Sequence, residues 1–468
     1  MSQLGTVEQP LRVAIIGSGP SGFYAAEHLL KQSNLVIFID MYDRLPTPYG
    51  LVRGGVAPDH DKIKSVSKVY DRIAANPRFR FFGNVEIGKH ITHDDLKAYY
   101  HQIVYAVGAQ TDRRLGVPGE DLIGSHAATE FVGWYNAHPD YRDLQFDLSQ
   151  ERAVVIGNGN VAMDVARILA SGYDELRKTD IADYALEALR NSKVKEIYML
   201  GRRGPAQAAF TNPELKEFGA LEEADIVVNV EDATLDPLSQ SDLDTNGDAD
   251  SRKNVELLQK YAQQQPVGKP KRITMRFLVS PAELIGTERV EAIKIVKNVL
   301  ERGSDGSLKA KATDQTEILP VGLVFRSIGY KGVPLAGVPF DAKAGVIPNQ
   351  AGRVIDPQTQ QTLTGEYVVG WIKRGPSGII GTNKPDSVAT ANAMLEDVPT
   401  LTATVNTADI EALIKQRQPD YVTFADWQLL DQVEVNNGQA EGRPRIKFSR
   451  IEDMIAAIKT ARVSNPTS

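Results

Sequence analysis

Two glycine-rich turns carry the residues of this sequence best suited to bind a phosphate. The first contains Gly17, Gly19 and Gly22, with the spacing G-x-G-x-x-G, directly after the apolar run 11–16. Gly17 permits a tight turn, Gly19 lets a pyrophosphate approach the backbone, and Gly22 lets the following helix pack against the strand. The N-terminus of that helix presents free N–H groups to the phosphates. This pattern predicts the first strand, turn and helix of a dinucleotide-binding unit; the alternative is a glycine turn without a ligand.

An acidic residue stands where such a unit binds ribose. A second strand is expected over residues 35–42, and Asp43 follows it about twenty residues beyond the last glycine. A carboxylate at the end of that strand can bind the ribose hydroxyls. Asp40 is a rival candidate, but its position is in the middle of the strand.

The second turn repeats the first with one change. The expected strand 153–156 is followed by Gly157, Gly159 and Ala162, with the spacing G-x-G-x-x-A, and then by a helix over 163–170. We therefore predict a second dinucleotide-binding unit.

The strand after this second turn ends in cations. Where an NAD site would carry an acid, the expected strand 194–200 is followed by Gly201, Arg202 and Arg203. Two guanidinium groups suit the 2′-phosphate of NADP and leave an acid-reading NAD site unmatched. The alternative is a charged surface turn.

The elements that must position these residues predict an α/β fold with two Rossmann-like dinucleotide-binding domains, one inserted into the other. We expect an FAD-binding domain in segments 1–109 and 329–468, the latter with a C-terminal extension, and an NADP-binding domain over 110–328. Other predicted elements are a shaped loop without strand or helix at 43–60, helices at 63–75, 94–100 and 385–395, strands at 79–85, 102–107, 274–279, 292–298 and 322–327, a flexible excursion at 231–270, and helices around 409–415 and 451–461.

Composition excludes several classes of protein. The chain has 468 residues, a net charge of −7 and no cysteine. The charge argues against a general nucleic-acid binder, and the lack of cysteine excludes disulfide redox chemistry and thiolate-ligated iron–sulfur clusters. No apolar run reaches about eighteen residues, so we expect no membrane span, and no secretory signal is recognised. A cytoplasmic location is the expectation.

Several longer motifs resemble one family. GSGPSG, LPTPYGLVRGGVAPDH, VVIGNGNVAMDVARILA, GRRGPAQAAFTNPEL and VVGWIKRGPSGIIGTNK together are similar to the adrenodoxin-reductase-type ferredoxin–NADP reductases, which are FAD flavoproteins. The matching blocks run from residue 11 to about residue 390. One mild departure is Asp43, where the family commonly has the longer Glu.

The resemblance implies roles for particular residues. FAD would contact the first glycine turn with Ser21, the ribose-binding Asp43, the lining residues Leu51 and Val85, and, at the isoalloxazine ring, Trp371, Gly378, Ile379 and Ile380. NADP would contact Asn158, Gly159, Asn160 and Val161 with its pyrophosphate, Arg202 and Arg203 with its 2′-phosphate, and Glu214 and Gly378 with its nicotinamide. His60 would lie near the reacting rings.

Three of these residues have plainer alternatives. His60 follows an aspartate in a loop and could make an ordinary loop contact. Glu214 could be an exposed helical acid, and Trp371 could be a core residue. Hydride transfer needs alignment of the two rings more than an acid or a base, so we assign His60 and Glu214 an orienting role in catalysis.

We predict an oxidoreductase that moves electrons between NADPH, FAD and a separate ferredoxin. Because the chain cannot hold a thiolate-ligated cluster, the one-electron partner must be another protein. The alternatives are the flavin input subunit of a glutamate-synthase-like complex, which carries cysteine-ligated clusters, and a non-catalytic FAD-binding interaction protein.

Overall fold

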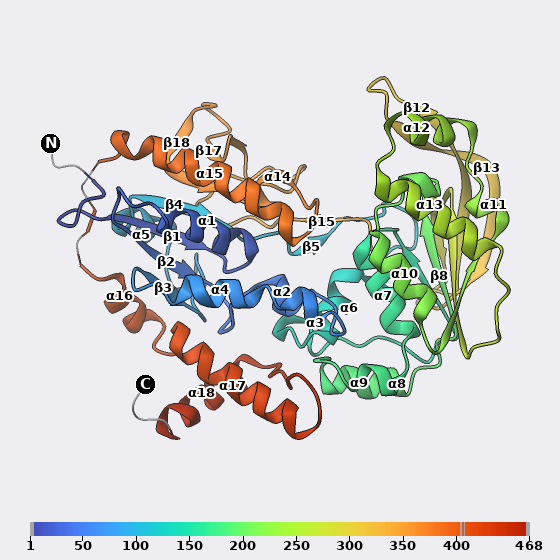
Figure 1. Cartoon of the computed structure of the whole chain (residues 1–468), viewed down its shortest axis with the longest axis horizontal. Helices are drawn as coiled ribbons and strands as arrows, with labels where there is room; N and C mark the ends of the chain where they lie inside the picture. The colour runs from blue at the N-terminus through green and yellow to red at the C-terminus, as the bar shows by residue number, and fades with distance from the viewer. Residues whose placement is uncertain (1–3, 403–404, 407, 465–468) are drawn as a thin grey trace. The chain divides into compact units, whose positions relative to one another are not determined.

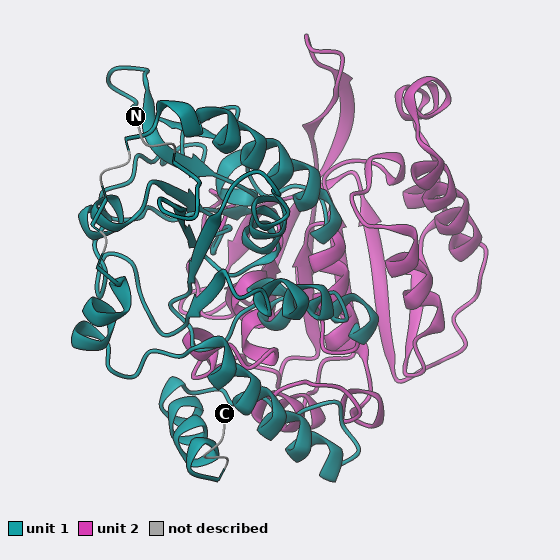
Figure 2. Ribbon diagram, turned by 60° about the vertical axis from the view of Figure 1, so that its left-hand side comes forward, with its two compact units in different colours: residues 1–56, 60–111, 329–468 teal, residues 57–59, 112–328 magenta. Residues whose placement is uncertain are grey.

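The two ends of the chain build one unit and its middle builds another (Figure 2). The computed structural model describes residues 4–402, 405–406 and 408–464. Unit 1 draws on residues 1–56, 60–111 and 329–468, and unit 2 on residues 57–59 and 112–328.

Most elements of unit 1 are labelled in Figure 1. Its strands are β1 Leu11–Ile16, β2 Ile37–Tyr42, β3 Phe79–Phe82, β4 Gln102–Tyr105, β15 Tyr330–Lys331, β16 Asn349–Gln350, β17 Arg353–Ile355 and β18 Thr362–Val368; β5 is Thr111–Asp112. Its helices are α1 Pro20–Leu30, α2 Leu51–Gly54, α3 Asp61–Lys64, α4 Ser67–Ala74, α5 His93–Tyr99, α14 Trp371–Arg374, α15 Asn383–Asp397, α16 Ile410–Arg417, α17 Phe424–Ala440 and α18 Ile451–Ser464, with short 3₁₀ turns at Ile380–Thr382 and Val398–Thr400.

The sheet of unit 1 is parallel through five of its seven strands. The order is β16-β17-β18-β4-β1-β2-β3, and β18, β4, β1, β2 and β3 run parallel. The chain passes from β1 outward to β2 and β3, then returns to β4 on the other side of β1. The strand order therefore reverses between β1 and β4, which is where such sheets bind ligands, beyond the carboxyl ends of the strands.

Both faces of this sheet are buried. Leu11, Val13 and Ile15 of β1 point into a core that includes residues of α1, α4, α15, α17 and α18. Ala14 and Ile16 point to the opposite core, where α5 and α16 contribute. Near-continuous apolar strands are the sequence signature of such a doubly covered parallel sheet. Helices α1 and α15 lie side by side over the first face (Figure 1).

Unit 2 has nine strands and eight α-helices in its described residues. The strands are β6 Ser125–Ala127, β7 Arg152–Ile156, β8 Glu196–Gly201, β9 Ala224–Val228, β10 Lys271–Phe277, β11 Val279–Ile285, β12 Ala292–Arg302, β13 Leu308–Pro320 and β14 Leu323–Arg326. The helices are α6 Ala128–Tyr135, α7 Asn160–Ala170, α8 Tyr173–Leu176, α9 Asp183–Arg190, α10 Asn212–Ala220, α11 Val230–Ala233, α12 Pro237–Asn246 and α13 Ala249–Ala262, with 3₁₀ turns at Pro139–Tyr141 and Pro205–Gln207.

A six-stranded parallel sheet of order β6-β14-β7-β8-β10-β9 forms the centre of unit 2. Helices α6, α7, α10 and α13 cover one face, where their apolar side chains join those of β7 and β8. The antiparallel sheet β11-β12-β13 covers the other face through residues such as Val279, Leu284 and Ile293. The predicted α/β class with two Rossmann-like units is confirmed.

The predicted flexible excursion at 231–270 is wrong, because this segment forms α11, α12 and α13. Asp236 caps α12 by accepting hydrogen bonds from the N–H groups of two residues in its first turn, and Asp248 caps α13. Leu258 and Tyr261 of α13 are buried in the core of unit 2, and the Tyr261 hydroxyl donates to the Leu215 carbonyl at 3.1 Å. Tertiary burial therefore stabilises helices that the polar composition did not suggest.

Smaller differences concern the loop and helix that follow β2. The loop 43–60 contains the short helix α2, and the predicted helix 63–75 is broken into α3 and α4. Between them the Ser65 hydroxyl donates to the Lys62 carbonyl at 2.6 Å, a local bond that competes with helix continuation. The long strand β13 and the long helix α17 were not predicted.

Candidate functional site

The first glycine turn lies at the reversal point of the sheet in unit 1. Gly17 follows β1 with φ of 102°, and its N–H donates to the Tyr42 carbonyl at 2.8 Å. A Cβ on Gly17 would lie 2.5 Å from the carbonyl oxygen of Ala106, which follows β4. A Cβ on Gly22 would lie 2.5 Å from the Gly17 carbonyl. Close backbone approach therefore requires glycine at both positions, and the positive φ is a second reason at Gly17.

Gly19, in contrast, faces open space. A Cβ on Gly19 would meet no described atom within 4 Å. Gly19 is the N-cap of α1 and supplies no capping side chain, and Pro20 has no N–H, so Ser21 and Gly22 carry the first N–H groups of the helix. Ser21 lies in the same turn and is buried. The cradle fits the pyrophosphate of a dinucleotide, which a helix N-terminus binds well.

The two candidate acids of β2 have different surroundings. Asp43 lies just beyond the strand and accepts hydrogen bonds from the N–H and hydroxyl of Ser18 and from the N–H of Leu45. Burial raises the pKa of Asp43, while these hydrogen bonds oppose the rise. Asp40 is buried within the strand, where Arg80 binds both of its oxygens at 2.7 and 2.8 Å and the Tyr100 hydroxyl donates at 2.6 Å. Both oxygens of Asp40 are therefore already bound by protein side chains, and Asp43 is the acid beside the glycine turn.

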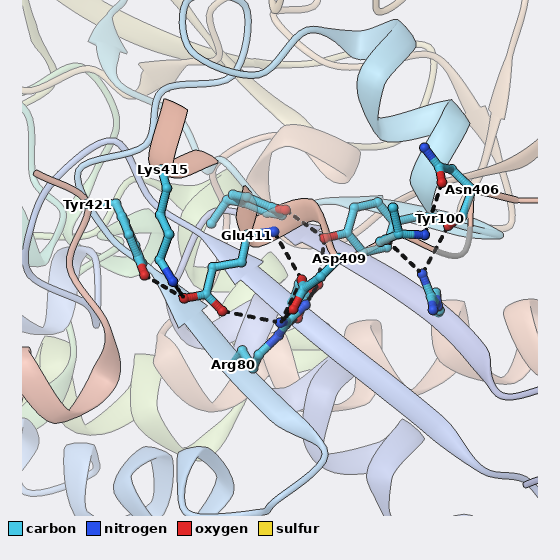
Figure 3. Close-up of polar contacts among 11 residues, drawn as sticks. Arg80, Tyr100, Asn406, Asp409, Glu411, Lys415 and Tyr421 are labelled. Atoms are coloured by element: carbon cyan, nitrogen blue, oxygen red, sulfur yellow. Dashed lines mark hydrogen bonds and ion pairs between the residues drawn. The ribbon is translucent and has the colours of Figure 1, made fainter. Parts of the chain in front are cut away.

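The arginine that holds Asp40 also holds the start of α16. Arg80 donates to Asp409 at 2.9 and 3.1 Å and pairs with Glu411 at 3.7 Å, and Glu411 in turn contacts Lys415 and Tyr421 (Figure 3). This network joins the C-terminal extension to the sheet of unit 1. It explains Asp40 as a structural residue.

The predicted lining residues of the first site differ in exposure. Leu51 is the first residue of α2 and is 44% exposed. Val85 is buried in the core, and its N–H donates to the Asp43 carbonyl at 2.9 Å. The Val85 N–H is thus already used, which leaves its carbonyl as the polar group that could face a ligand.

Trp371 begins α14 and is half-buried, so the alternative of a plain core residue does not describe it. Its ring stacks on Tyr330 with centroids 5.4 Å apart, and its indole N–H donates to the Ser377 carbonyl at 3.2 Å. The next segment contains Gly378, with φ of 78°, Ile379, whose side chain is 58% exposed, and Ile380, which is half-buried. This segment is a turn in which Gly378 and Ile379 are exposed, while the carbonyls of Ser377, Ile379 and Ile380 already accept hydrogen bonds.

The turn of unit 2 repeats the geometry of the first. Gly157 follows β7 with φ of 137°, and a Cβ on it would lie 2.1 Å from the carbonyl oxygen of Ser327, which follows β14. The sheet order reverses between these two strands. Gly159 is the uncapped N-cap of α7, and a Cβ there would meet no described atom within 4 Å. A second pyrophosphate cradle thus lies at the equivalent place.

A neighbouring loop supports this second turn. Asn158 accepts the N–H of Ala209 through its carbonyl at 3.0 Å, and the Asn160 side chain accepts the N–H of Thr211 at 2.8 Å. Val161, in the first turn of α7, is half-buried. The turn is therefore fixed by the loop that leads to α10.

Arg202 and Arg203 follow β8, the strand beside β7. Arg202 is exposed and Arg203 is half-buried. Neither guanidinium forms an ion pair with any acid in the described ranges. Burial, followed by the charge of Arg202, lowers the pKa of Arg203. Two adjacent cations without an acidic partner among the described residues have a charge that suits an anion.

Glu214 lies in the first turn of α10 and belongs to an ionic cluster of unit 2. It is 6% exposed, so the alternative of an exposed helical acid is wrong. Its carboxylate binds Arg167 at 3.0 Å, and Arg167 also binds Asp59 at 2.8 and 3.0 Å and Asp164 at 2.7 Å. Burial would lower the pKa of Arg167, but these three carboxylates raise it well above its ordinary value. Arg167 is thus a permanently charged anchor for Glu214.

Sequence reasoning identified Glu214 but missed this cluster. The available signal was a single arginine in the apolar helix VAMDVARILA, three residues after Asp164. His60 belongs to unit 1, where it is half-buried and its carbonyl accepts the N–H groups of Ile63 and Lys64. His60 therefore belongs to unit 1 and Glu214 to unit 2.

Comparison with known proteins finds similar chains over nearly the whole length of this one. The pyridine nucleotide-disulphide oxidoreductase family matches residues 11–200. The NADPH-ferredoxin reductase FprA of Mycobacterium tuberculosis is 46% identical over 459 residues, which cover 96% of this chain and 99% of that protein. The mitochondrial NADPH:adrenodoxin oxidoreductase of Arabidopsis thaliana is 39% identical over 465 residues, covering 96% and 95%.

A solved structure is similar over the same extent. Mycobacterium tuberculosis FprA in complex with NADPH has a TM-score of 0.90 and 45% identity to this chain, covering 96% of this chain and 100% of that one. Across the described parts of this chain, the helices are too short or too polar to span a bilayer.

Proposed function

This chain belongs to the adrenodoxin-reductase-type ferredoxin–NADP reductases, and we propose that it transfers electrons between NADPH and a separate ferredoxin through bound FAD. Unit 1 would be the FAD-binding domain, formed by the predicted segments 1–109 and 329–468. Unit 2 would be the NADP-binding domain, predicted over 110–328.

One observation supports this assignment above the others. The same turn geometry occurs twice, but the strand beside the turn ends in Asp43 in unit 1 and in Arg202 and Arg203 in unit 2. A carboxylate suits ribose hydroxyls, and a pair of guanidinium groups suits a 2′-phosphate. Two cofactors of different charge are therefore expected, one in each unit.

In unit 1 the proposed FAD contacts are the glycine turn with Ser21, Asp43 at the ribose, and the segment from Trp371 to Ile380 at the ring. The open space at Gly19 supports binding of the pyrophosphate there. The exposed position of Gly378, where φ is 78° and no side chain intervenes, supports close approach of a planar ring to the main chain there.

In unit 2 the proposed NADP contacts are the turn from Asn158 to Val161 and the two arginines after β8. The phosphate-bearing adenosine would be held by charge, and the nicotinamide would be placed near Glu214. Arg167 would fix the direction of the Glu214 carboxylate, because Arg167 is itself held in place by Asp59 and Asp164.

The residues of this chain act by position. When bound, FAD supplies a site that accepts two electrons from NADPH as hydride and returns them singly. Arg202 and Arg203 would bind the far end of the coenzyme, so that the nicotinamide is placed by geometry rather than by its own affinity. Glu214 and His60 would orient the reacting rings and exclude water, since hydride transfer needs no obligatory proton at either residue.

A single purified protein tests the proposal. The protein should be yellow, should release FAD on denaturation, and should lose its flavin absorbance when NADPH is added without oxygen, much faster than with NADH. Cytochrome c reduction by NADPH should then depend on an added ferredoxin from the same genome. A colourless protein, or a flavoprotein indifferent to ferredoxin, would contradict the proposal. A cytoplasmic location stays a prediction from the sequence.

A further inference from the structure

The loop 45–53 lies directly on the first glycine turn. The Tyr49 N–H donates to the Ser18 carbonyl at 3.0 Å, and a Cβ on Gly50 would lie 3.0 Å from the Cα of Gly19. Tyr49 has φ of 85°, a left-handed conformation that a tyrosine adopts only when its surroundings impose it. Something outside the loop must therefore hold this conformation against the turn.

The C-terminal helix α17 makes the contacts that hold the loop. Glu434 of α17 binds Arg53 with both carboxylate oxygens, at 2.6 and 2.8 Å, although the two residues are 381 positions apart. The Glu434 side chain is fully buried and also accepts the N–H of Phe448 at 2.9 Å. Lys447 donates to the Arg53 carbonyl at 3.3 Å. The arginine is thus fixed through its side chain and its backbone.

Trp427, two turns earlier on α17, contacts the same loop. Its indole N–H donates to the Tyr49 hydroxyl at 3.2 Å, and the two rings meet edge to face with centroids 5.7 Å apart. The Arg53 guanidinium lies 5.0 Å from the centre of the Trp427 ring. The Tyr49 hydroxyl also donates to Asp71 of α4. The two ends of the segment Tyr49–Arg53 are therefore both attached to α17.

A second attachment supports the neighbouring residues of the same site. Val422, just before α17, exchanges two backbone hydrogen bonds of 2.8 Å with Gly83. Gln418 donates to the Asn84 carbonyl at 2.9 Å, and the Asn84 side chain donates to the Asp420 carbonyl at 3.0 Å. Asn84 has φ of 58° and immediately precedes Val85.

We infer that Glu434 and Trp427 are positioning residues for FAD. They hold the loop 45–53 against the glycine turn, so the C-terminal extension completes the flavin site instead of serving as a separate module. The inference rests on the proposed function, because it assumes that the turn at Gly19 binds the FAD pyrophosphate. It assigns a purpose to a segment for which the sequence suggested none.

Glu434→Gln is the sharpest perturbation. Both carboxylate oxygens accept from donors, so a glutamine must turn its own N–H₂ group toward a donor in either orientation. We expect FAD to bind the apoprotein about tenfold more weakly and to dissociate correspondingly faster. The readouts are quenching of flavin fluorescence during titration of the apoprotein, and the rate of fluorescence recovery on dilution of the holoprotein.

Asp426→Asn is the matched control. Asp426 lies on the same helix, is buried, and binds Arg462 with both oxygens at 2.7 and 2.6 Å, with no described contact to the loop 45–53. Both variants should lower the unfolding midpoint of the apoprotein, but only Glu434→Gln should weaken FAD binding. Binding of 2′,5′-ADP to unit 2 should be unchanged in both.

A second variant keeps the test decisive if Glu434→Gln does not fold. Trp427→Phe retains an aromatic ring but loses the N–H that binds Tyr49, and it should weaken FAD binding about threefold. Wild-type FAD affinity in either folded variant, or an equal loss in Asp426→Asn, would overturn the inference. If the wild-type protein itself binds no FAD, the proposed function fails instead, so the two failures are distinguishable.

Discussion

Replacing Arg202 and Arg203, the two arginines after β8, should lower the kcat/KM for NADPH far more than the kcat/KM for NADH. Arg202 and Arg203 have no acidic partner among the described residues, so a 2′-phosphate would gain contacts that the free protein does not already make. A charge-assisted hydrogen bond contributes about 1.5–3 kcal/mol. Arg202 is exposed and belongs at the lower end of this range, whereas Arg203 is half-buried and belongs higher.

With NADPH, the double variant Arg202→Gln/Arg203→Gln should therefore lose about 4 kcal/mol of transition-state stabilisation. This loss corresponds to roughly a thousandfold decrease in kcat/KM. The loss should appear mainly in KM, because the contact is remote from the hydride. The kcat/KM for NADH should change less than about threefold. Of the single variants, Arg203→Gln should show the larger loss, since its guanidinium is the more desolvated.

The assay is steady-state reduction of ferricyanide or of ferredoxin-coupled cytochrome c with each coenzyme. Arg152→Gln is a suitable control, because Arg152 begins β7 at the opposite end of the same sheet and pairs with Glu196 at 2.7 Å. Equal losses for NADPH and NADH would refute the reasoning, as would an NADPH-selective loss in the control.

Three further outcomes are expected. Gly19→Val should yield a folded protein without flavin, because its side chain would occupy the open space at the turn; full FAD occupancy on purification would contradict this. Replacing His60 or Glu214 with alanine should slow flavin reduction in single-turnover kinetics tenfold to a hundredfold, about 1.4–2.7 kcal/mol, with little change in NADPH affinity; wild-type rates would exclude an orienting role. Burial lowers the pKa of His126 to about 4, so the unfolded chain binds its proton first as pH falls from about 6.5, and unit 2 should lose up to about 3 kcal/mol of stability by about pH 4. Denaturant unfolding of His126→Phe should show a flatter pH dependence, and an unchanged slope would contradict the assignment.

The parts of the fold that depend on residues close together in the sequence were predictable from the sequence. Strand, turn and helix from Leu11 to Leu30 follow from apolar patterning and glycine spacing, and so do the unit from Arg152 to Ala170 and the cations after β8. Contacts between distant residues were not predictable. Arg53 and Glu434 form an ion pair across 381 positions, and Tyr261 stabilises α13 through a carbonyl in another helix. Composition predicts neither of these two contacts, because both contacts depend on tertiary packing.

The glycine turns account for one part of the functional assignment, and residues on a neighbouring strand account for the other. Gly17 and Gly157 occupy equivalent places, each against the backbone that follows the strand on the far side of the reversal point. This shared scaffold selects a dinucleotide but not which one. We expect the choice to be made one strand away, by Asp43 in unit 1 and by Arg202 and Arg203 in unit 2, since these are the side chains that would meet the ribose. Specificity would then change through one or two residues while the scaffold stays constant, and substitution of the two arginines, which pair with no described acid, should test function without disturbing the fold.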